Sequence, residues 1–231
     1  YSVWNYDQNS LYDTLPMYQA LAESKNTSAV WLLDKLGIQR GIAKLEDFGI
    51  SIGEADENLG AIALGGMSTG VTPVQLASAY TTFVNEGVRT EARFITKIVD
   101  ATGAVIVDNT NPETNRVTTA AVAEEMTSML MGVYADGGTG ASAQPSNGMV
   151  IAGKTGTTEL DREPGYIKSQ WMVGYTPDLV VATWLGYDET NEAHNLNNAG
   201  KTMANLYSAE MGALLSISLQ TEFAVAAAEE T

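Results

Sequence analysis

The sequence predicts an α+β domain in which helices pack against an antiparallel sheet. Three observations indicate this fold class: helical periodicity fills the first part of the chain, β-rich runs bracket one more helix, and the last runs are joined by a tight turn. With 231 residues, 45% of them hydrophobic, the chain can bury a sizeable core. We expect residues 1–214 to form the C-terminal part of one domain, followed by a partly disordered tail, residues 215–231.

Two helices are predicted first, at residues 14–24 and 28–36, because apolar residues recur there at helical spacing. Ser28 is expected to cap the second helix and Gly37 to end it. The tripeptide Ser24-Lys25-Asn26 therefore lies on a short turn between helices.

A third helix is predicted at residues 39–48, and the glycine-rich stretch from Gly60 to Gly70 predicts a loop. The clearest local signal follows. Thr72 can cap a helix, Pro73 suits the first helical position, and Gln75 can close a capping box. We expect this helix to reach about residue 85.

Two β-rich runs, residues 93–99 and 104–107, flank a short turn and predict a hairpin. A helix is expected next at residues 119–134. Its apolar face is marked by Val122, Met126, Met129, Leu130 and Val133. Three strands are predicted after it, at residues 149–157, 169–175 and 179–187, with the last two forming an antiparallel hairpin. A final helix is expected at residues 199–214. Because three strands make a small sheet with exposed edges, further strands are expected from sequence upstream of this chain.

Composition excludes several classes of function. The chain has 12 basic and 28 acidic residues, a formal net charge of −16 that repels phosphate backbones, so nucleic acid is not expected as a partner. It has no cysteine and one histidine, His194, which we expect to be solvent-exposed, so thiolate and multi-histidine metal sites are excluded. No apolar run approaches the roughly 20 residues that cross a bilayer. Because the chain does not begin with Met, we expect it to be part of a longer protein.

The first candidate site is Lys154-Thr155-Gly156-Thr157, at the end of an apolar strand. An ammonium beside two hydroxyls, with a glycine that lets a ligand approach the backbone, suits the binding of a carboxylate. The alternative is structural: a solvated lysine at a strand end, with Gly156 in a bulge.

The second candidate is Ser24-Lys25-Asn26. The hydroxyl of Ser24 can relay a proton, and the amide of Asn26 can orient a peptide group of a substrate. Ordinary helix capping is the alternative and, for the tripeptide alone, the favoured one.

Together the two candidates and their surroundings resemble the transpeptidase domain of class A penicillin-binding proteins. That family combines a Ser-x-x-Lys nucleophile motif, a Ser-x-Asn motif and Lys-Thr-Gly. The resemblance covers Asn5 to about Leu214 and extends well beyond the two motifs. Its flanking segments are residues 15–22, 28–30, 70–73, 76–80, 171–178 and 184–188.

The resemblance implies a role for each candidate residue. Ser24 shuttles a proton between the nucleophile and the leaving group, and Asn26 hydrogen-bonds the amide of a peptide stem or of a penicillin side chain. Lys154 supplies positive potential, and Thr155 and Thr157 offer hydroxyls to the substrate carboxylate. The backbone amide of Thr157 serves as one oxyanion-hole donor, and Gly156 keeps the strand edge open.

One departure from the family pattern changes what is expected of this chain. No serine is followed three positions later by lysine, so the nucleophile motif is absent. In the family it lies upstream of Ser-x-Asn. We therefore expect the nucleophile, its helix and the first strands to belong to an upstream half of the same protein, and this chain alone to form no acyl-enzyme.

The function implied is D,D-transpeptidation of peptidoglycan stem peptides through a serine acyl-enzyme, without metal or organic cofactor. The partners implied are stem peptides, β-lactam antibiotics as covalent inhibitors, and the upstream half of the same protein. The location implied is the extracytoplasmic face of a bacterial membrane. Two alternatives stay open: a serine β-lactamase, which shares the fold and hydrolyses the acyl-enzyme, and a non-catalytic penicillin-binding-like module for sensing or protein contact.

Overall fold

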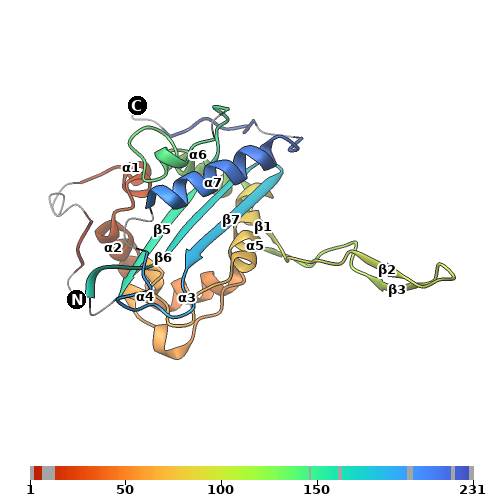
Figure 1. Ribbon diagram of the computed structural model, residues 1–231, viewed down its shortest axis with the longest axis horizontal. Coiled ribbons are helices and arrows are strands. Elements are labelled where there is room, and N and C mark those ends of the chain that lie inside the picture. Colours follow the sequence, from red (N-terminus) through yellow and green to blue (C-terminus); the bar gives the residue numbers. More distant parts are fainter. Residues whose placement is uncertain are drawn as a thin grey trace.

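A computed structural model describes residues 3–6, 14–145, 147–160, 163–196, 200–219 and 222–228. It confirms an α+β architecture of helices around an antiparallel sheet (Figure 1). In chain order the elements are α1 (Met17–Ala22), α2 (Asn26–Leu36), α3 (Ile38–Asp47), η1 (Glu54–Asp56), α4 (Leu59–Leu64), α5 (Pro73–Val84), β1 (Val88–Thr90), β2 (Lys97–Val99), β3 (Val105–Asp108), β4 (Thr114–Arg116), α6 (Ala120–Met131), η2 (Ala141–Ala143), β5 (Ala152–Leu160), β6 (Glu163–Thr176), β7 (Leu179–Gly186) and α7 (Gly200–Leu215).

The central sheet has the order β5-β6-β7, with both pairs antiparallel. Helix α7 lies across one face of it (Figure 1), and packs closely enough that a Cβ at Gly174 would overlap the Tyr207 hydroxyl. Helices α5 and α6 pack on the opposite face. There Phe83 stacks on Tyr175, and the Tyr175 hydroxyl shares a hydrogen bond of 2.9 Å with Thr127. The sheet is therefore held between two helical layers, and β5 forms one edge of it.

The core lies between the sheet and helices α6 and α7. Its largest fully buried side chains are Tyr134, Tyr175 and Tyr207. Tyr134 donates its hydroxyl proton to the Val173 carbonyl at 2.8 Å, so one buried phenol is satisfied by the central strand. Burial of this core fixes β5, the strand that carries Lys154, against α6 and the loop that follows it.

Local signals at several elements are confirmed. Thr72 and Gln75 form the predicted capping box of α5, with Pro73 as its first residue. Gly37, at φ +92°, ends α2 as expected. The strands expected at residues 169–175 and 179–187 are β6 and β7, joined at the predicted turn.

Some expectations were wrong. Helix α2 begins at Asn26, so Ser28 lies inside it and caps nothing. The reason is non-local: Asn5 Oδ1 accepts the free backbone N–H of Thr27 at 3.0 Å, which replaces a local cap. The stretch from Gly60 to Gly70 is not all loop, because α4 occupies its first part. Val122 is 47% exposed and does not belong to the buried face of α6.

The predicted hairpin is present as β2 and β3, although only residues 97–99 of the first run form a strand. This hairpin lies on an arm that projects from the body, whereas β1 and β4 pair at the base of the arm and β1 packs against α5 (Figure 1). Apolar side chains on this arm, such as Phe94 and Ile106, are exposed.

The tail expected to be partly disordered is described at residues 216–219 and 222–228. In this part Phe223 contacts Tyr175 edge to face, at 5.9 Å between ring centroids, and Ala228 donates its backbone N–H to the Ser128 carbonyl. The remaining tail residues lie outside the described part of the chain, so the expectation stays a prediction for them. Among the described residues no helix is long and apolar enough to cross a membrane.

Candidate active site

The turn that carries Ser24 is a Schellman motif at the end of α1. The backbone N–H of Ser24 donates to the Leu21 carbonyl at 3.2 Å, and that of Lys25 donates to the Ala20 carbonyl at 2.9 Å. Ser24 occupies the left-handed position of this motif, with φ +55°. Glycine or asparagine usually stands there, because a Cβ costs energy at positive φ. Backbone conformations of this kind collect at functional sites, which makes Ser24 a candidate for a functional role.

The hydroxyl of Ser24 meets the side chain of Lys154. Lys154 Nζ donates to Ser24 Oγ at 2.8 Å across a sequence separation of 130 residues, and also to the Thr155 carbonyl at 2.9 Å. Ser24 is exposed and Lys154 is half-buried, so their hydrogen bond lies where the partly shielded ammonium reaches the protein surface. The two candidate motifs, which sequence reasoning could join only through a family resemblance, therefore form one site.

Burial governs the electrostatics of this pair. Removal of Lys154 from water lowers the pKa of its ammonium from 10.5 to about 8. The positive charge of Lys154 is therefore lost as the pH rises through about 8, so the electrostatics of the pair depend on pH close to the physiological range.

Both structural alternatives for the motifs are disfavoured by this geometry. Ser24 does not cap α2, whose N-cap is Lys25 and has no side-chain capping bond. Lys154 is not a solvated strand end, because it holds two hydrogen bonds. Gly156 lies in regular register opposite Trp171, and the irregularities of β5 come only after Thr158.

Asn26 is the first residue of α2 and is partly buried. Its side-chain amide donates to the Trp4 carbonyl at 3.0 Å. An asparagine amide has two N–H donors, so this bond engages one of them. Because this partner belongs to the chain itself, the expected bond of Asn26 to a substrate amide stays a prediction.

Thr155 and Thr157 follow Lys154 on the edge strand, half-buried and exposed respectively. The Thr155 hydroxyl shares a hydrogen bond of 2.6 Å with the hydroxyl of Thr139. Sequence reasoning missed Thr139. It lies in the Gly137-Gly138-Thr139-Gly140 segment, which follows the helix expected at residues 119–134. The signal available in the sequence was a threonine among glycines, upstream of Lys154, where the backbone can approach a neighbouring strand closely.

The other polar residue considered, His194, is exposed as expected. Its ring stacks on Tyr187 with centroids 5.3 Å apart, which is a contact at the surface.

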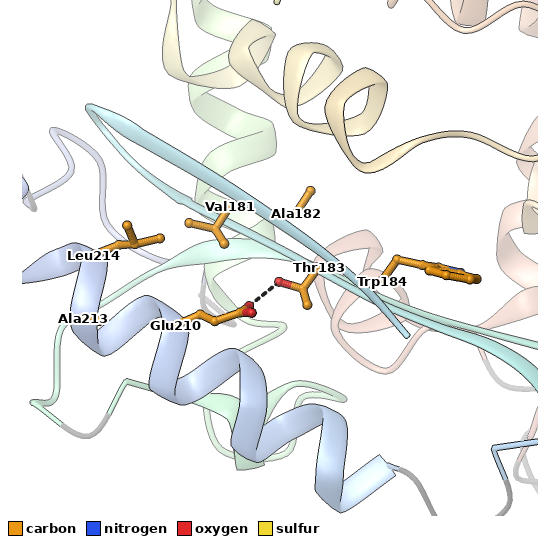
Figure 2. A pocket seen from close by; sticks show the side chains of 7 residues that line it. All are labelled: Val181, Ala182, Thr183, Trp184, Glu210, Ala213 and Leu214. Atoms are coloured by element: carbon orange, nitrogen blue, oxygen red, sulfur yellow. Dashed lines mark hydrogen bonds between the residues drawn. The ribbon is translucent and has the colours of Figure 1, made fainter. Parts of the chain in front are cut away.

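A separate groove of about 520 Å³ lies between β7 and α7 (Figure 2). It is mostly apolar, with one polar contact in which Thr183 Oγ1 donates to Glu210 Oε2 at 2.6 Å. The groove is two strands away from Lys154 on β5, so the Ser24–Lys154 pair is not part of it.

The fold and the paired motifs place the chain in the penicillin-binding class of proteins. Comparison with known proteins gives the family: residues 1–211 match the penicillin binding protein transpeptidase domain. The chain belongs to this family, which confirms the resemblance found in the sequence.

Two curated relatives illustrate the similarity. The chain is 43% identical over 202 residues to penicillin-binding protein 2a of Streptococcus pneumoniae, covering 87% of this chain and 27% of the relative. It is 38% identical over 208 residues to penicillin-binding protein 1F of Bacillus subtilis, covering 90% of this chain and 28% of the relative. The chain thus spans little more than a quarter of the length of these proteins.

Solved structures share the fold. One of the PonA1 protein from Mycobacterium tuberculosis in complex with penicillin V has a TM-score of 0.76 at 24% identity, covering 98% of this chain and 63% of that one. One of penicillin-binding protein 1A from Haemophilus influenzae has a TM-score of 0.69 at 24% identity, covering 91% and 36%. The predicted fold class is confirmed by these neighbours.

Proposed function

We propose that this chain forms part of a D,D-transpeptidase that cross-links peptidoglycan stem peptides through a serine acyl-enzyme. The observation that carries the proposal is the hydrogen bond of 2.8 Å between Lys154 and Ser24. It joins two motifs that lie 130 residues apart in the sequence. The attacking serine lies in a part of the protein outside this chain, because no serine here precedes a lysine at the required spacing.

The reaction is an acyl transfer in two steps. The serine oxygen attacks the carbonyl carbon of the penultimate D-alanine, the bond to the terminal D-alanine nitrogen breaks, and the serine proton ends on that nitrogen. An amine of a neighbouring stem peptide then attacks the ester carbonyl. The new amide forms, the serine oxygen leaves, and the proton of the amine returns to it.

Ser24 is suited to carry the proton in both steps. Its hydroxyl both donates and accepts, and Lys154 fixes its orientation at 2.8 Å. The same ammonium attracts the carboxylate of the terminal D-alanine, with the hydroxyls of Thr155 and Thr157 as further donors. Asn26 holds a stem-peptide amide. The backbone N–H of Thr157 contributes one oxyanion-hole donor, beside a strand edge kept free of bulk by Gly156.

The proposal is tested by labelling the full-length protein with a fluorescent penicillin, followed by denaturation and mass mapping. We expect one stable covalent adduct on a serine of a Ser-x-x-Lys motif outside this chain. A Lys154→Ala variant should lose labelling, while Lys201→Ala, which removes an exposed lysine from α7, should not. Equal labelling of wild type and Lys154→Ala would overturn the role of Lys154. No labelling of wild type would favour a non-catalytic module.

The lifetime of the adduct separates the transpeptidase from a β-lactamase. A transpeptidase holds the penicilloyl ester, whereas a hydrolase releases it within seconds. The sequence similarity to penicillin-binding proteins over most of the chain favours the long-lived adduct. The proposed partners are accordingly stem peptides, β-lactams and the rest of the same protein, at the extracytoplasmic face of a bacterial membrane. This chain on its own is expected to form no acyl-enzyme.

A further inference from the structure

The loop from Gly137 to Gly140 touches both halves of the candidate site. The hydroxyl of Thr139 shares a hydrogen bond of 2.6 Å with that of Thr155 on β5. The backbone N–H of Thr139 donates to the Ala22 carbonyl at 3.1 Å, in the last residue of α1. That helix end leads directly into the turn that presents Ser24. One residue therefore bridges the strand that carries Lys154 and the helix end that positions Ser24.

The loop is held against the end of α6 in a way that only glycine allows. The Gly140 N–H donates to the Val133 carbonyl at 2.8 Å. A Cβ at Gly138 would overlap the carbonyl oxygens of Gly132 and Val133, so the backbone approaches α6 more closely than any side chain permits. The Thr139 hydroxyl is thus presented from a fixed support.

We propose that Thr139 is a positioning residue that orients the hydroxyl of Thr155 toward the carboxylate of the substrate. This inference rests on the proposed function. A threonine hydroxyl rotates freely unless a neighbour fixes it. When Thr155 donates its proton to a carboxylate, its oxygen is left to accept the proton of Thr139. The two hydroxyls then point in the same direction, and each bond strengthens the other.

The role of Thr139 is specific to carboxylate recognition. A penicillin whose carboxylate is converted to a methyl ester offers Thr155 a much weaker acceptor, so the benefit of an aligned Thr155 proton largely disappears. A residue that merely holds the loop together would affect acid and ester alike. The comparison of the two compounds therefore separates positioning from structural support.

The test measures the acylation rate constant of the full-length protein with penicillin G and with its methyl ester. Thr139→Val removes the hydroxyl at nearly constant volume, and Thr139→Ala removes it without added branching should the valine variant fail to fold. Thr139→Ser retains the hydroxyl. Thr96→Val is the matched control, because Thr96 is exposed on the projecting arm, away from β5.

We expect Thr139→Val and Thr139→Ala to slow acylation by penicillin G roughly fivefold, the effect of about one ordinary hydrogen bond, and to leave the ester rate within twofold of wild type. Thr139→Ser and Thr96→Val should match wild type. An unchanged penicillin G rate, or equal slowing with acid and ester, overturns the inference while the proposed function stands. Absence of acylation in wild type overturns both.

Discussion

Replacement of Ser24 by glycine should give a more stable protein than replacement by alanine. Both variants lose the hydroxyl and its hydrogen bond to Lys154, so their difference isolates the backbone conformation at φ +55°. A residue with a Cβ pays about 1–2 kcal/mol in the left-handed region, and glycine pays nothing there. The greater freedom of glycine in the unfolded chain offsets about 0.4–1 kcal/mol of this gain.

The net expectation is that Ser24→Gly exceeds Ser24→Ala in free energy of unfolding by about 1 kcal/mol. In a protein of this size that difference corresponds to a rise in Tm of about 2–4 °C. Urea and thermal unfolding of the purified variants measure it. Both variants should also slow acylation severely in the full-length protein, so they differ in stability while their activity is lowered alike.

Asp34 provides the control, because it is exposed within α2. At this position Asp34→Ala should be more stable than Asp34→Gly by about 1 kcal/mol, because glycine is unfavourable inside a helix. The order of glycine and alanine should therefore invert between the two sites. If Ser24→Ala is as stable as Ser24→Gly, or more stable, the Schellman geometry assigned to this turn is wrong.

Three further predictions concern β5 and α5. Gly153→Ala should destabilise the protein by about 3 kcal/mol, because the added Cβ would overlap the Val173 carbonyl oxygen. The Cβ of Gly156→Ala has its nearest neighbour at 3.4 Å, so this variant should cost well under half of that free energy. Urea unfolding measures both costs, and equal costs would refute the packing argument. Burial lowers the pKa of Lys154 to about 8, so acylation by penicillin should fall as the pH rises through about 8, because the ammonium is then lost. An acylation rate that stays constant between pH 7 and 9 would contradict the electrostatic role of Lys154. Thr72→Ala should lower the free energy of unfolding by about 1 kcal/mol, because the capping box of α5 is lost. An unchanged midpoint of urea unfolding would show that the capping box contributes nothing to stability.

Local chemistry explains which elements the sequence could predict. The start of α5 is determined by three adjacent residues with complementary preferences, and it was predicted correctly. Helix α4 was missed because its two glycines, at positions 60 and 65, look like loop signals. In the structure Asn58 caps this helix by accepting the Ala61 N–H at 2.9 Å, Gly60 is buried inside it, and Gly65 ends it at φ +76°. Burial and a cap outweigh glycine's weak helix propensity there.

Non-local contacts explain most of what could not be predicted. The start of α2 depends on Asn5, 22 residues upstream of Thr27, whose N–H it accepts. The residues of the two motifs could be named from the sequence, but their meeting at 2.8 Å across 130 positions is a property of the fold. Thr139 was overlooked for the same reason, because its partner Thr155 is brought to it only by the packing of β5 beside α6.

The central claim is that Ser24 and Lys154 act as one unit in acyl transfer. The most direct test is a double-mutant cycle in the full-length protein, with acylation rate constants for Ser24→Ala, Lys154→Ala and the double variant. We predict that each single change slows acylation severely and that the double variant is little slower than the worse single one, because either change already breaks the pair. Effects that multiply in the double variant would contradict a shared function.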